Sequence, residues 1–236
     1  MAQELSGQRI LVVGASGGIG AATARAFAKV GAHIVPAGRP TDRLDAIAAE
    51  TGGTAAPLDV LDHAAIEAFF ARETPFDHVV IAAASTKTGP VGGLPLDDAK
   101  AAMESKFWGA YRIARAARVN DGGSITFISG FLAVRPSSGA VLQGAINAAL
   151  EALSRGLALE RAPVRVNTVS PGVIDTPLWQ GMPADKRAAL FGQTADGLPV
   201  HRVGQPEDIA AAVLFLAANT FATGTTVTVD GGGSIA

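Results

Sequence analysis

Short apolar runs alternate with helical segments along the whole chain, and this alternation limits the fold more than any other feature. Seven runs have the length and composition of buried strands: Ile10 to Val13, His33 to Ala37, Thr54 to Leu58, His78 to Ala82, Ser124 to Ile128, Val164 to Val169 and Thr226 to Val229. Six segments with apolar residues three and four apart lie between them: Ala21 to Val30, Asp42 to Glu50, Ala64 to Arg72, Asp97 to Val119, Val141 to Arg161 and Glu207 to Ala218. Strands that alternate with helices imply right-handed crossovers. The sequence therefore predicts an α/β fold, a doubly wound, seven-stranded parallel sheet with helices on both faces.

No linker or repeat divides the chain, which favours a single domain over residues 1–236. Two segments rich in Pro, Gly and Ser, residues 83–95 and 170–205, follow strands. Such loops lie at the carboxyl edge of a parallel sheet, where α/β proteins bind ligands. Residues 170–205, here called the lid, contain four larger apolar residues: Leu178, Trp179, Met182 and Phe191. We expect them to contact a substrate, although packing of the lid on the sheet or a contact between subunits explains them equally well.

Composition excludes several classes of site. The chain has no cysteine, which rules out disulfides, thiolate catalysis, Fe–S clusters and cysteine-ligated zinc. The four histidines (His33, His63, His78 and His201) lack ligand spacing, so no metal site is expected.

The charge balance points to a small-molecule partner. With 19 basic and 21 acidic residues, nothing favours nucleic acid or an anionic membrane. No apolar run reaches the roughly 18 residues of a membrane helix, and the start, Met1 to Arg9, lacks an export pattern. We expect a cytoplasmic protein.

A glycine-rich turn directly follows the first strand and opens into a helix. Glycines at these positions allow close backbone approach to a pyrophosphate, and the helix start offers unpaired N–H groups and a positive dipole end. The residues expected to contact the phosphates are Gly14, Ser16, Gly17, Gly18, Ile19 and Gly20.

The end of the second strand bears on the choice between NADP and NAD. An acidic residue there would hold the ribose 2′-hydroxyl of NAD, but this strand ends Ala37-Gly38-Arg39. The guanidinium of Arg39 suits a 2′-phosphate. NADP(H) is therefore preferred over NAD(H), unless Arg39 only stacks on adenine or lies in solvent.

Four motifs together resemble the short-chain dehydrogenase/reductase family over essentially the whole length of the chain. They are Gly14-(x)3-Gly18-x-Gly20, Leu58-Asp59-Val60, Arg165-Val166-Asn167 leading to Pro171-Gly172-Val173-Ile174-Asp175-Thr176, and Val229-Asp230-Gly231-Gly232. The resemblance implies a Rossmann-type dinucleotide fold and a homodimer or homotetramer formed through the fourth and fifth helices.

The resemblance also assigns cofactor contacts. It implies that Asp59 and Val60 flank the adenine, and that Ala82, Ala83 and Ala84 line the cofactor where the family usually has Asn-Asn-Ala-Gly. It further implies that Val173 to Thr176 hold the nicotinamide carboxamide. The remaining cofactor contacts expected in this segment are Pro171, Gly172, Val173, Ile174 and Thr176.

The chain departs from the family at all four catalytic positions. Lys106 stands where the family has Asn, Gly130 where it has Ser, Gln143 where it has Tyr, and Asn147 where it has Lys. The chain's one tyrosine, Tyr111, is five residues past Lys106 and so about 140° round the helix from it, which favours a packing or interface role.

Asn and Lys have thus exchanged positions that, by the resemblance, face each other beside the nicotinamide. Lys106 would place its ammonium near the volume of the lost lysine, where it would hold ribose hydroxyls or act as an electrophile. The alternative is a solvated Lys106, or one paired with Glu104 or Asp98. Ser129 is expected to cap or bond backbone rather than replace the missing Ser. Ser137 and Ser138 fit a substrate loop or a plain turn.

These residues support an atypical NADP(H)-dependent oxidoreductase that acts on a small activated substrate through Lys106, Gln143 and Asn147. Without a positioned acid, which typically contributes about 10²- to 10⁴-fold, general ketone reduction would be slow. The rival interpretation is an NADP(H)-binding pseudoenzyme or sensor without turnover. Non-redox chemistry in the same pocket is a third.

Overall fold

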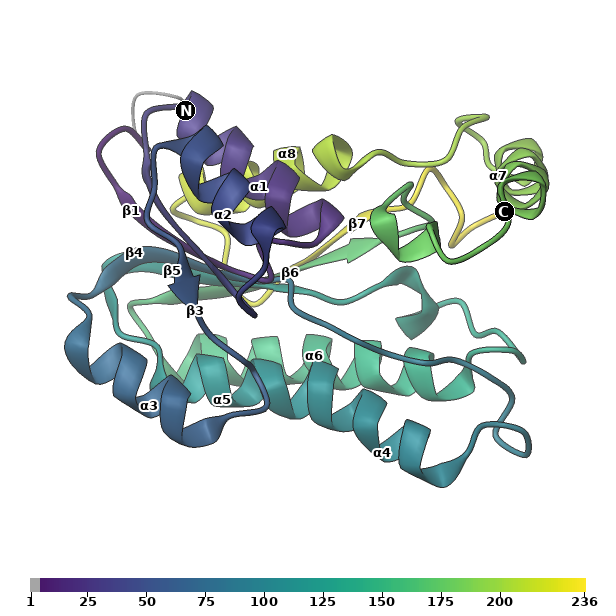
Figure 1. Cartoon of the computed structure of the whole chain (residues 1–236), viewed down its shortest axis with the longest axis horizontal. Coiled ribbons are helices and arrows are strands. Elements are labelled where there is room, and N and C mark those ends of the chain that lie inside the picture. Colours follow the sequence, from purple (N-terminus) through teal and green to yellow (C-terminus); the bar gives the residue numbers. More distant parts are fainter. Residues whose placement is uncertain (1–4) are drawn as a thin grey trace.

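One parallel sheet of seven strands forms the centre of the computed structural model, which describes residues 5–236 (Figure 1). Its order is β3-β2-β1-β4-β5-β6-β7, and every neighbouring pair is parallel. The strands are β1 Arg9–Val13, β2 His33–Gly38, β3 Ala56–Pro57, β4 Phe76–Ile81, β5 Val119–Ile128, β6 Arg165–Pro171 and β7 Thr226–Val229. The predicted fold class is confirmed. Of the chain's start, Met1 to Glu4 lie outside the described residues.

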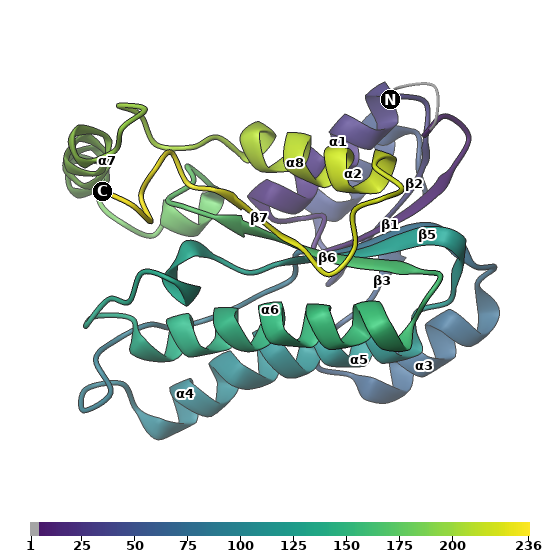
Figure 2. The same cartoon turned by 180° about the vertical axis from the view of Figure 1, so that it is seen from behind.

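Helices cover both faces of the sheet (Figures 1 and 2). The α-helices are α1 Gly18–Lys29, α2 Asp42–Thr51, α3 His63–Arg72, α4 Leu96–Met103, α5 Gly109–Ala116, α6 Val141–Glu160, α7 Ala184–Gly197 and α8 Pro206–Ala218. Short helical turns are η1 Glu104–Trp108, η2 Phe131–Ala133 and η3 Pro177–Trp179. Helices α1, α2 and α8 lie on one face, and α3, α4, α5 and α6 lie on the other.

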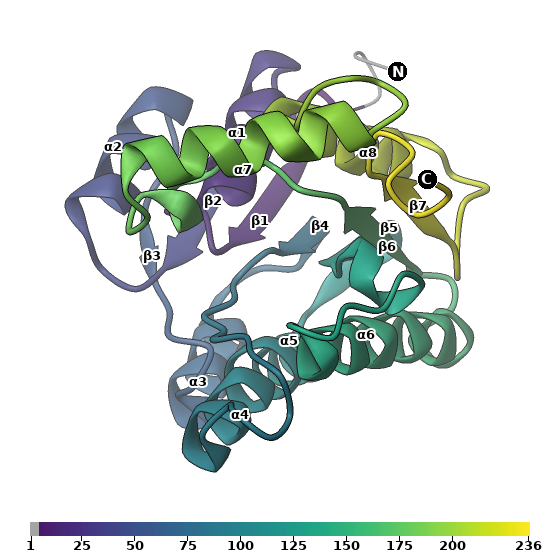
Figure 3. The ribbon, with the colours of Figure 1, turned by 90° about the vertical axis from the view of Figure 1, so that its right-hand side faces the viewer.

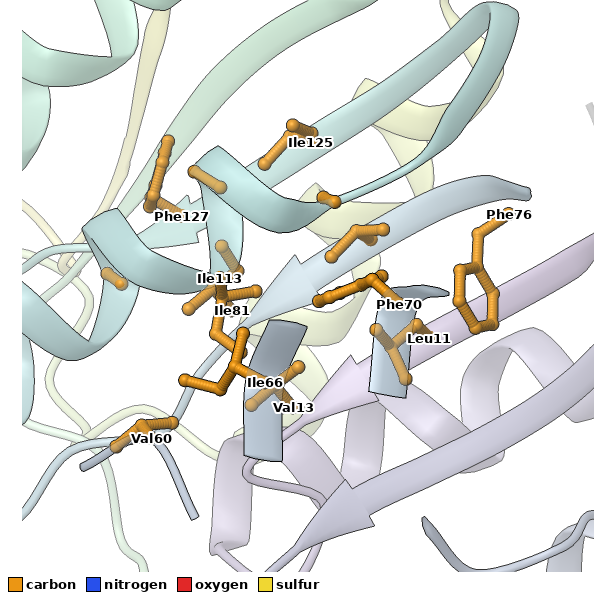
Figure 4. Packing of buried hydrophobic residues seen from close by; sticks show 14 of the residues in the cluster. Leu11, Val13, Val60, Ile66, Phe70, Phe76, Ile81, Ile113, Ile125 and Phe127 are labelled. Carbon is orange, nitrogen blue, oxygen red and sulfur yellow. The ribbon is translucent and has the colours of Figure 1, made fainter. Parts of the chain in front are cut away.

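Two hydrophobic cores result from the alternation of side chains along each strand. Leu11 and Val13 of β1 join the core under α3, α5 and α6, where Figure 4 shows them beside Ile66, Phe70 and Ile113. Ile10 and Val12 point the other way, into the core under α1, α2 and α8. Burial on both faces explains why the strands are continuous apolar runs instead of alternating ones.

Several helix starts follow from side chains read in the sequence. The Thr41 hydroxyl accepts a hydrogen bond from the Leu44 N–H at 3.2 Å, and the Asp62 carboxylate accepts one from the Ala65 N–H at 2.9 Å. Pro206 occupies the first turn of α8, beside a capping box between Gln205 and Asp208. The three helices begin within one residue of the predicted starts at Asp42, Ala64 and Glu207.

Three elements differ from the predictions. The segment from Asp97 to Val119 is not one α-helix: α4 passes into a π-helical turn, η1, before α5 begins, and Val119 already belongs to β5. The third strand is two residues long, because only Ala56 and Pro57 pair with β2. The lid contains a 14-residue helix, α7, that was predicted as loop.

The long loops meet at the carboxyl ends of the strands. Figure 3 looks at this edge and shows α7 crossing it on the side of α1, α2 and α8. Between β1 and β4 the strand order reverses direction, which is where doubly wound sheets bind ligands. Among residues 5–236, no helix has the length and apolar character required to cross a bilayer.

Candidate active site

The glycine turn between β1 and α1 is built of backbone contacts that exclude side chains. Gly14 has φ +90°, and a Cβ on it would stand 2.6 Å from the Ala83 nitrogen. A Cβ on Gly20 would stand 2.2 Å from the Gly14 oxygen. Gly17 occupies the N-cap of α1, and no side chain caps that helix start. The N–H groups of Gly14, Ala15 and Gly17 are paired with backbone carbonyls, so the N–H groups left for a pyrophosphate are those at the uncapped start of α1.

The start of the lid rests on this turn. A Cβ on Gly18 would come within 2.8 Å of the Thr176 side chain and 3.0 Å of Pro177 Cδ. Ile174 is fixed by a bridge to Gly204, and the Gly172 N–H donates to the Val229 carbonyl at 3.0 Å. The segment from Pro171 to Thr176 thus runs from the end of β6 to the glycine turn.

The other predicted cofactor residues lie along the same edge. Arg39 is exposed directly after β2 and has no ion-pair partner within residues 5–236. The Asp59 carboxylate accepts from the Leu61 N–H at 3.0 Å, and the Val60 side chain is part of the core. The Ala82 N–H donates to the Val13 carbonyl at 2.8 Å, which holds Ala82 to Ala84 against the glycine turn.

Lys106 projects from the π-helical turn η1 toward the end of β5 and toward α6. Its Nζ donates to the Ser129 carbonyl at 2.8 Å and to Asn147 Oδ1 at 2.7 Å. Although part of the side chain is exposed, burial of the ammonium lowers the pKa of Lys106 to about 8. The two exchanged positions do face each other, and neither Glu104 nor Asp98 pairs with Lys106: Glu104 pairs with Arg112, and Asp98 with Lys87.

The Asn147 side chain has one possible orientation. Its Oδ1 accepts from Lys106 and also from Gln143 Nε2, at 3.1 Å, so a flipped amide would set donor against donor. Its Nδ2 consequently faces Gly130, where a Cβ would stand only 2.6 Å away. Gly130, at the family's Ser position, leaves the space that the amide occupies.

Sequence reasoning missed Glu151. It lies one helical turn beyond Asn147 on α6, is 8% exposed, and accepts from the Ser129 hydroxyl at 2.9 Å. Ser129 was expected to cap or bond backbone, but its hydroxyl lies 3.4 Å from the nearest backbone partner, the Val169 carbonyl, so its main partner is the carboxylate. One signal in the sequence could have identified Glu151. It follows Gln143 and Asn147 at the same four-residue spacing, which places all three on one face of the helix.

The lid residues and Tyr111 make local contacts. Trp179 Nε1 donates to the Ile174 carbonyl at 2.8 Å, and the Trp179 ring packs edge-on against Phe191 at 5.9 Å. Leu178 is 77% exposed. Tyr111 is also exposed and packs on Trp108, whereas Lys106 points into the protein, as the angle between them predicts.

Two hollows lie outside the Lys106 cluster. One of about 360 Å³ is bordered by Thr176, Gln180 and Arg187 of the lid and by the start of α8. A larger one of about 520 Å³ lies between the β2 edge and α3, and shares no residue with the candidate site.

The histidines form no metal centre in the described residues. Within residues 5–236, no group of three His, Asp or Glu residues is arranged to hold a metal ion. His78 is instead buried between Ser124 Oγ and Gln8 Oε1, each 2.7 Å from a ring nitrogen.

The arrangement supplies a buried, hydrogen-bonded cation, Lys106, at the same carboxyl edge of the sheet as the glycine turn. An ammonium whose pKa is about 8 can give up a proton near neutral pH, whereas the amides of Gln143 and Asn147 can donate hydrogen bonds but cannot exchange a proton usefully. Asn147 and Ser129 hold that ammonium, and Gln143 supports Asn147.

Comparison with known proteins agrees with this architecture. A family model described as enoyl-(acyl carrier protein) reductase matches residues 14–234. L-fucose dehydrogenase from Rattus norvegicus is 33% identical, over 98% of this chain and 90% of its own length. Galactitol 2-dehydrogenase (L-tagatose-forming) from Cereibacter sphaeroides is 33% identical, over 97% of this chain and 95% of its own. The crystal structure of a small-chain dehydrogenase in complex with NADPH is 35% identical with a TM-score of 0.87, covering 98% of this chain and all of that one.

The fold, the glycine turn and these matches define the class: the chain belongs to the short-chain dehydrogenase/reductase family of oxidoreductases. The predicted resemblance is thereby confirmed at the level of the family.

Proposed function

We propose that the chain is an NADP(H)-dependent oxidoreductase in which Lys106 serves in place of the family's usual acid. The observation that carries the proposal is the contact of Lys106 Nζ with Asn147 Oδ1 at 2.7 Å. By the resemblance, Lys106 stands at the family's Asn position and Asn147 at its Lys position. If the two side chains lay apart, these would be unrelated changes. Because they are hydrogen-bonded, we treat them as one rearranged site.

The residues present fit a dinucleotide. The space beside Gly14 and Gly20 admits backbone only, and α1 begins there without a side-chain cap, so phosphate oxygens can approach its N–H groups. Arg39 is free to bind a 2′-phosphate, which favours NADP(H) over NAD(H). Asp59, Val60 and Ala82 to Ala84 would line the adenine side, and Pro171 to Thr176 the nicotinamide side. When bound, the nicotinamide supplies or accepts the hydride.

Lys106 would act on the substrate oxygen. Two of its three ammonium hydrogens are committed to Ser129 and Asn147, which leaves one for a substrate. In the reductive direction that hydrogen bond stabilises the charge that develops on oxygen and can pass a proton to it. A donor aimed at developing charge in a closed site contributes about 2.7–4 kcal/mol.

The substrate is inferred to be small and activated, such as an enone, a quinone or a carbonyl bearing an electron-withdrawing neighbour. Such acceptors need less help from an acid than a simple ketone does. The named relatives, dehydrogenases of L-fucose and galactitol, support a redox reaction on a small compound.

Fluorescence titration with NADPH and NADH, followed by NADPH oxidation against ketones, quinones, enones and imines, tests the proposal. We expect tighter NADPH binding and turnover of activated acceptors, with kcat lowered about 10²-fold or more by Lys106→Met. Lys100→Met removes an exposed lysine of α4 and serves as the control. Binding without oxidation of any acceptor would favour the pseudoenzyme, and absence of binding would overturn the cofactor assignment.

A further inference from the structure

Only one end of the Gln143 amide has a partner. Its Nε2 donates to Asn147 Oδ1 at 3.1 Å. Its Oε1 is buried and has no hydrogen-bond partner anywhere in residues 5–236. Because Asn147 Oδ1 also accepts from Lys106, it can face only donors, and the Gln143 amide cannot turn round to pair its oxygen there.

A buried acceptor of this kind indicates a missing donor. Nearly all buried side-chain acceptors in proteins are paired, and those that are not call for an explanation such as a ligand. Gln143 stands at the position where the resemblance places the family's Tyr. Neither the hydride transfer nor the role proposed for Lys106 uses its oxygen.

The unpaired acceptor lies beside an available donor. Lys106 Nζ and Gln143 Nε2 both bond the same oxygen of Asn147, so the remaining hydrogen of Lys106 and the Gln143 Oε1 belong to neighbouring groups of one site. A substrate that fills both must carry an acceptor and, close to it, a donor. A carbonyl oxygen next to a carbon that bears a hydroxyl has this arrangement.

We propose that Gln143 determines substrate specificity by accepting a hydrogen bond from a hydroxyl on the carbon next to the reacting one, so that the substrates are α-hydroxy ketones and vicinal diols. This inference rests on the proposed function. In reduction, the carbonyl carbon receives hydride from bound NADPH, its oxygen receives a proton from Lys106, and Lys106 recovers a proton from solvent. The products are the vicinal diol and NADP⁺, and the hydroxyl held by Gln143 is unchanged.

Matched pairs of substrates test this directly. The wild type is assayed with NADPH on hydroxyacetone against acetone, and on 2-hydroxycyclohexanone against cyclohexanone. Sites that hydrogen-bond a substrate hydroxyl discriminate strongly against analogues without it, so we expect kcat/KM to favour the hydroxy ketone by about 30-fold or more. Comparable kcat/KM within each pair would overturn the proposal.

Two variants of Gln143 separate its oxygen from its bulk. Gln143→Met keeps the length and removes the acceptor, so the preference for the hydroxy ketone should fall to within about 3-fold of unity. Gln143→Asn keeps both ends of the amide on a side chain one methylene shorter and should retain more of the preference than Gln143→Met, even if overall turnover changes. A preference that survives in Gln143→Met would contradict the role.

A binding measurement keeps the inference independent of turnover. In the presence of NADP⁺, trans-1,2-cyclohexanediol and cyclohexanol are titrated while the fluorescence of Trp108 and Trp179 is followed. The diol should bind at least about 10-fold more tightly, and only if Gln143 is present. Tighter binding of the diol without any turnover would refute the proposed reaction but leave the role of Gln143 in specificity intact. Equal affinity for the two alcohols would refute the role of Gln143 alone.

Discussion

At the scale of single residues, three side chains and one absent side chain define the candidate site. Gly130 leaves room for the Asn147 amide, Asn147 accepts from Lys106, and Gln143 holds the same oxygen. These contacts join the four positions into one hydrogen-bonded cluster. We therefore propose that the four residues act together and are not independent departures from the family's usual set.

The pKa of Lys106 predicts how activity depends on pH. Lys106 is charged below about pH 8 and neutral above it. If the ammonium serves as the acid, kcat/KM for reduction should fall as pH rises through 8, and the rate of the reverse oxidation should rise over the same interval. Lys106→Met should remove this limb from both profiles, and a limb that persists in the variant would assign the titration to another group.

Gly130→Ser is expected to lower both stability and activity, although the resemblance to the family would place a serine at this position. Its Cβ would stand 2.6 Å from Asn147 Nδ2, so the amide must move and release Lys106. We expect a loss of about 1–3 kcal/mol in the free energy of unfolding, as for other overpacked sites, with a lower kcat.

Gly156→Ser provides the control, because a Cβ at that position of α6 meets nothing within 4 Å. Urea denaturation of both variants and steady-state kinetics make the comparison. Full activity and stability in Gly130→Ser would show that Asn147 does not need the space.

At the scale of elements, the sheet is tied together by buried polar groups as well as by its cores. Arg165 of β6 donates to the carbonyls of Leu216 and Ala217 at the end of α8, at 2.6 and 2.8 Å, where a cation is also favoured by the helix dipole. His78 of β4 bridges Ser124 of β5 and Gln8 before β1. Such contacts fix how neighbouring elements lie against each other.

His78 should make the protein sensitive to acid. Burial, helped by the Arg165 cation, lowers the pKa of His78 from 6.5 to about 4. As pH falls from 6.5 to 4, His78 becomes protonated in the unfolded chain but stays neutral in the folded protein. The free energy of unfolding therefore falls across this window, by on the order of 3 kcal/mol.

Urea denaturation between pH 7 and pH 4 measures this loss. His78→Gln should show a flatter dependence, whereas His33→Gln, a change at an exposed histidine, should behave like the wild type. An equally steep slope in His78→Gln would mean that other groups cause the acid sensitivity.

The elements also show where sequence reasoning succeeded and where it stopped. The alternation of strands and helices and the glycine turn were predicted because they depend on local patterns in the sequence. The order of the strands depends on long-range pairing and was not predicted. The short β3 and the π-helical turn η1 depend on tertiary contacts, and nothing in Glu104 to Trp108 distinguishes a π turn from an α turn. The Lys106 to Asn147 contact was foreseen only through the family resemblance, and the partnership of Ser129 with Glu151 was not foreseen.

At the scale of the whole molecule, the candidate site runs across the carboxyl edge of the sheet. Arg39 follows β2 at one end, and the segment from Pro171 to Thr176 follows β6 at the other. The sheet thus sets the separation of groups that would hold the two halves of one dinucleotide. The lid helix α7 crosses the same edge on the side of α1, α2 and α8 (Figure 3).

Arg39→Asp should reverse the choice of coenzyme. Replacing the exposed cation by a carboxylate removes the partner of a 2′-phosphate and supplies one for a ribose hydroxyl. We expect NADPH affinity to fall about 10- to 100-fold, which corresponds to losing one or two charge-assisted hydrogen bonds, with NADH affinity unchanged or improved. Fluorescence titration measures the affinities for NADPH and NADH. An unchanged NADPH affinity would show that Arg39 does not contact the 2′-phosphate.

The contact between Gly130 and the Asn147 amide also limits which single substitutions leave this cluster intact. A side chain at position 130 requires the amide to move, because a Cβ there would stand 2.6 Å from Asn147 Nδ2. A lysine at position 147 would bring a second ammonium beside Lys106. We therefore expect that redesign of this site has to change positions 106, 130 and 147 together.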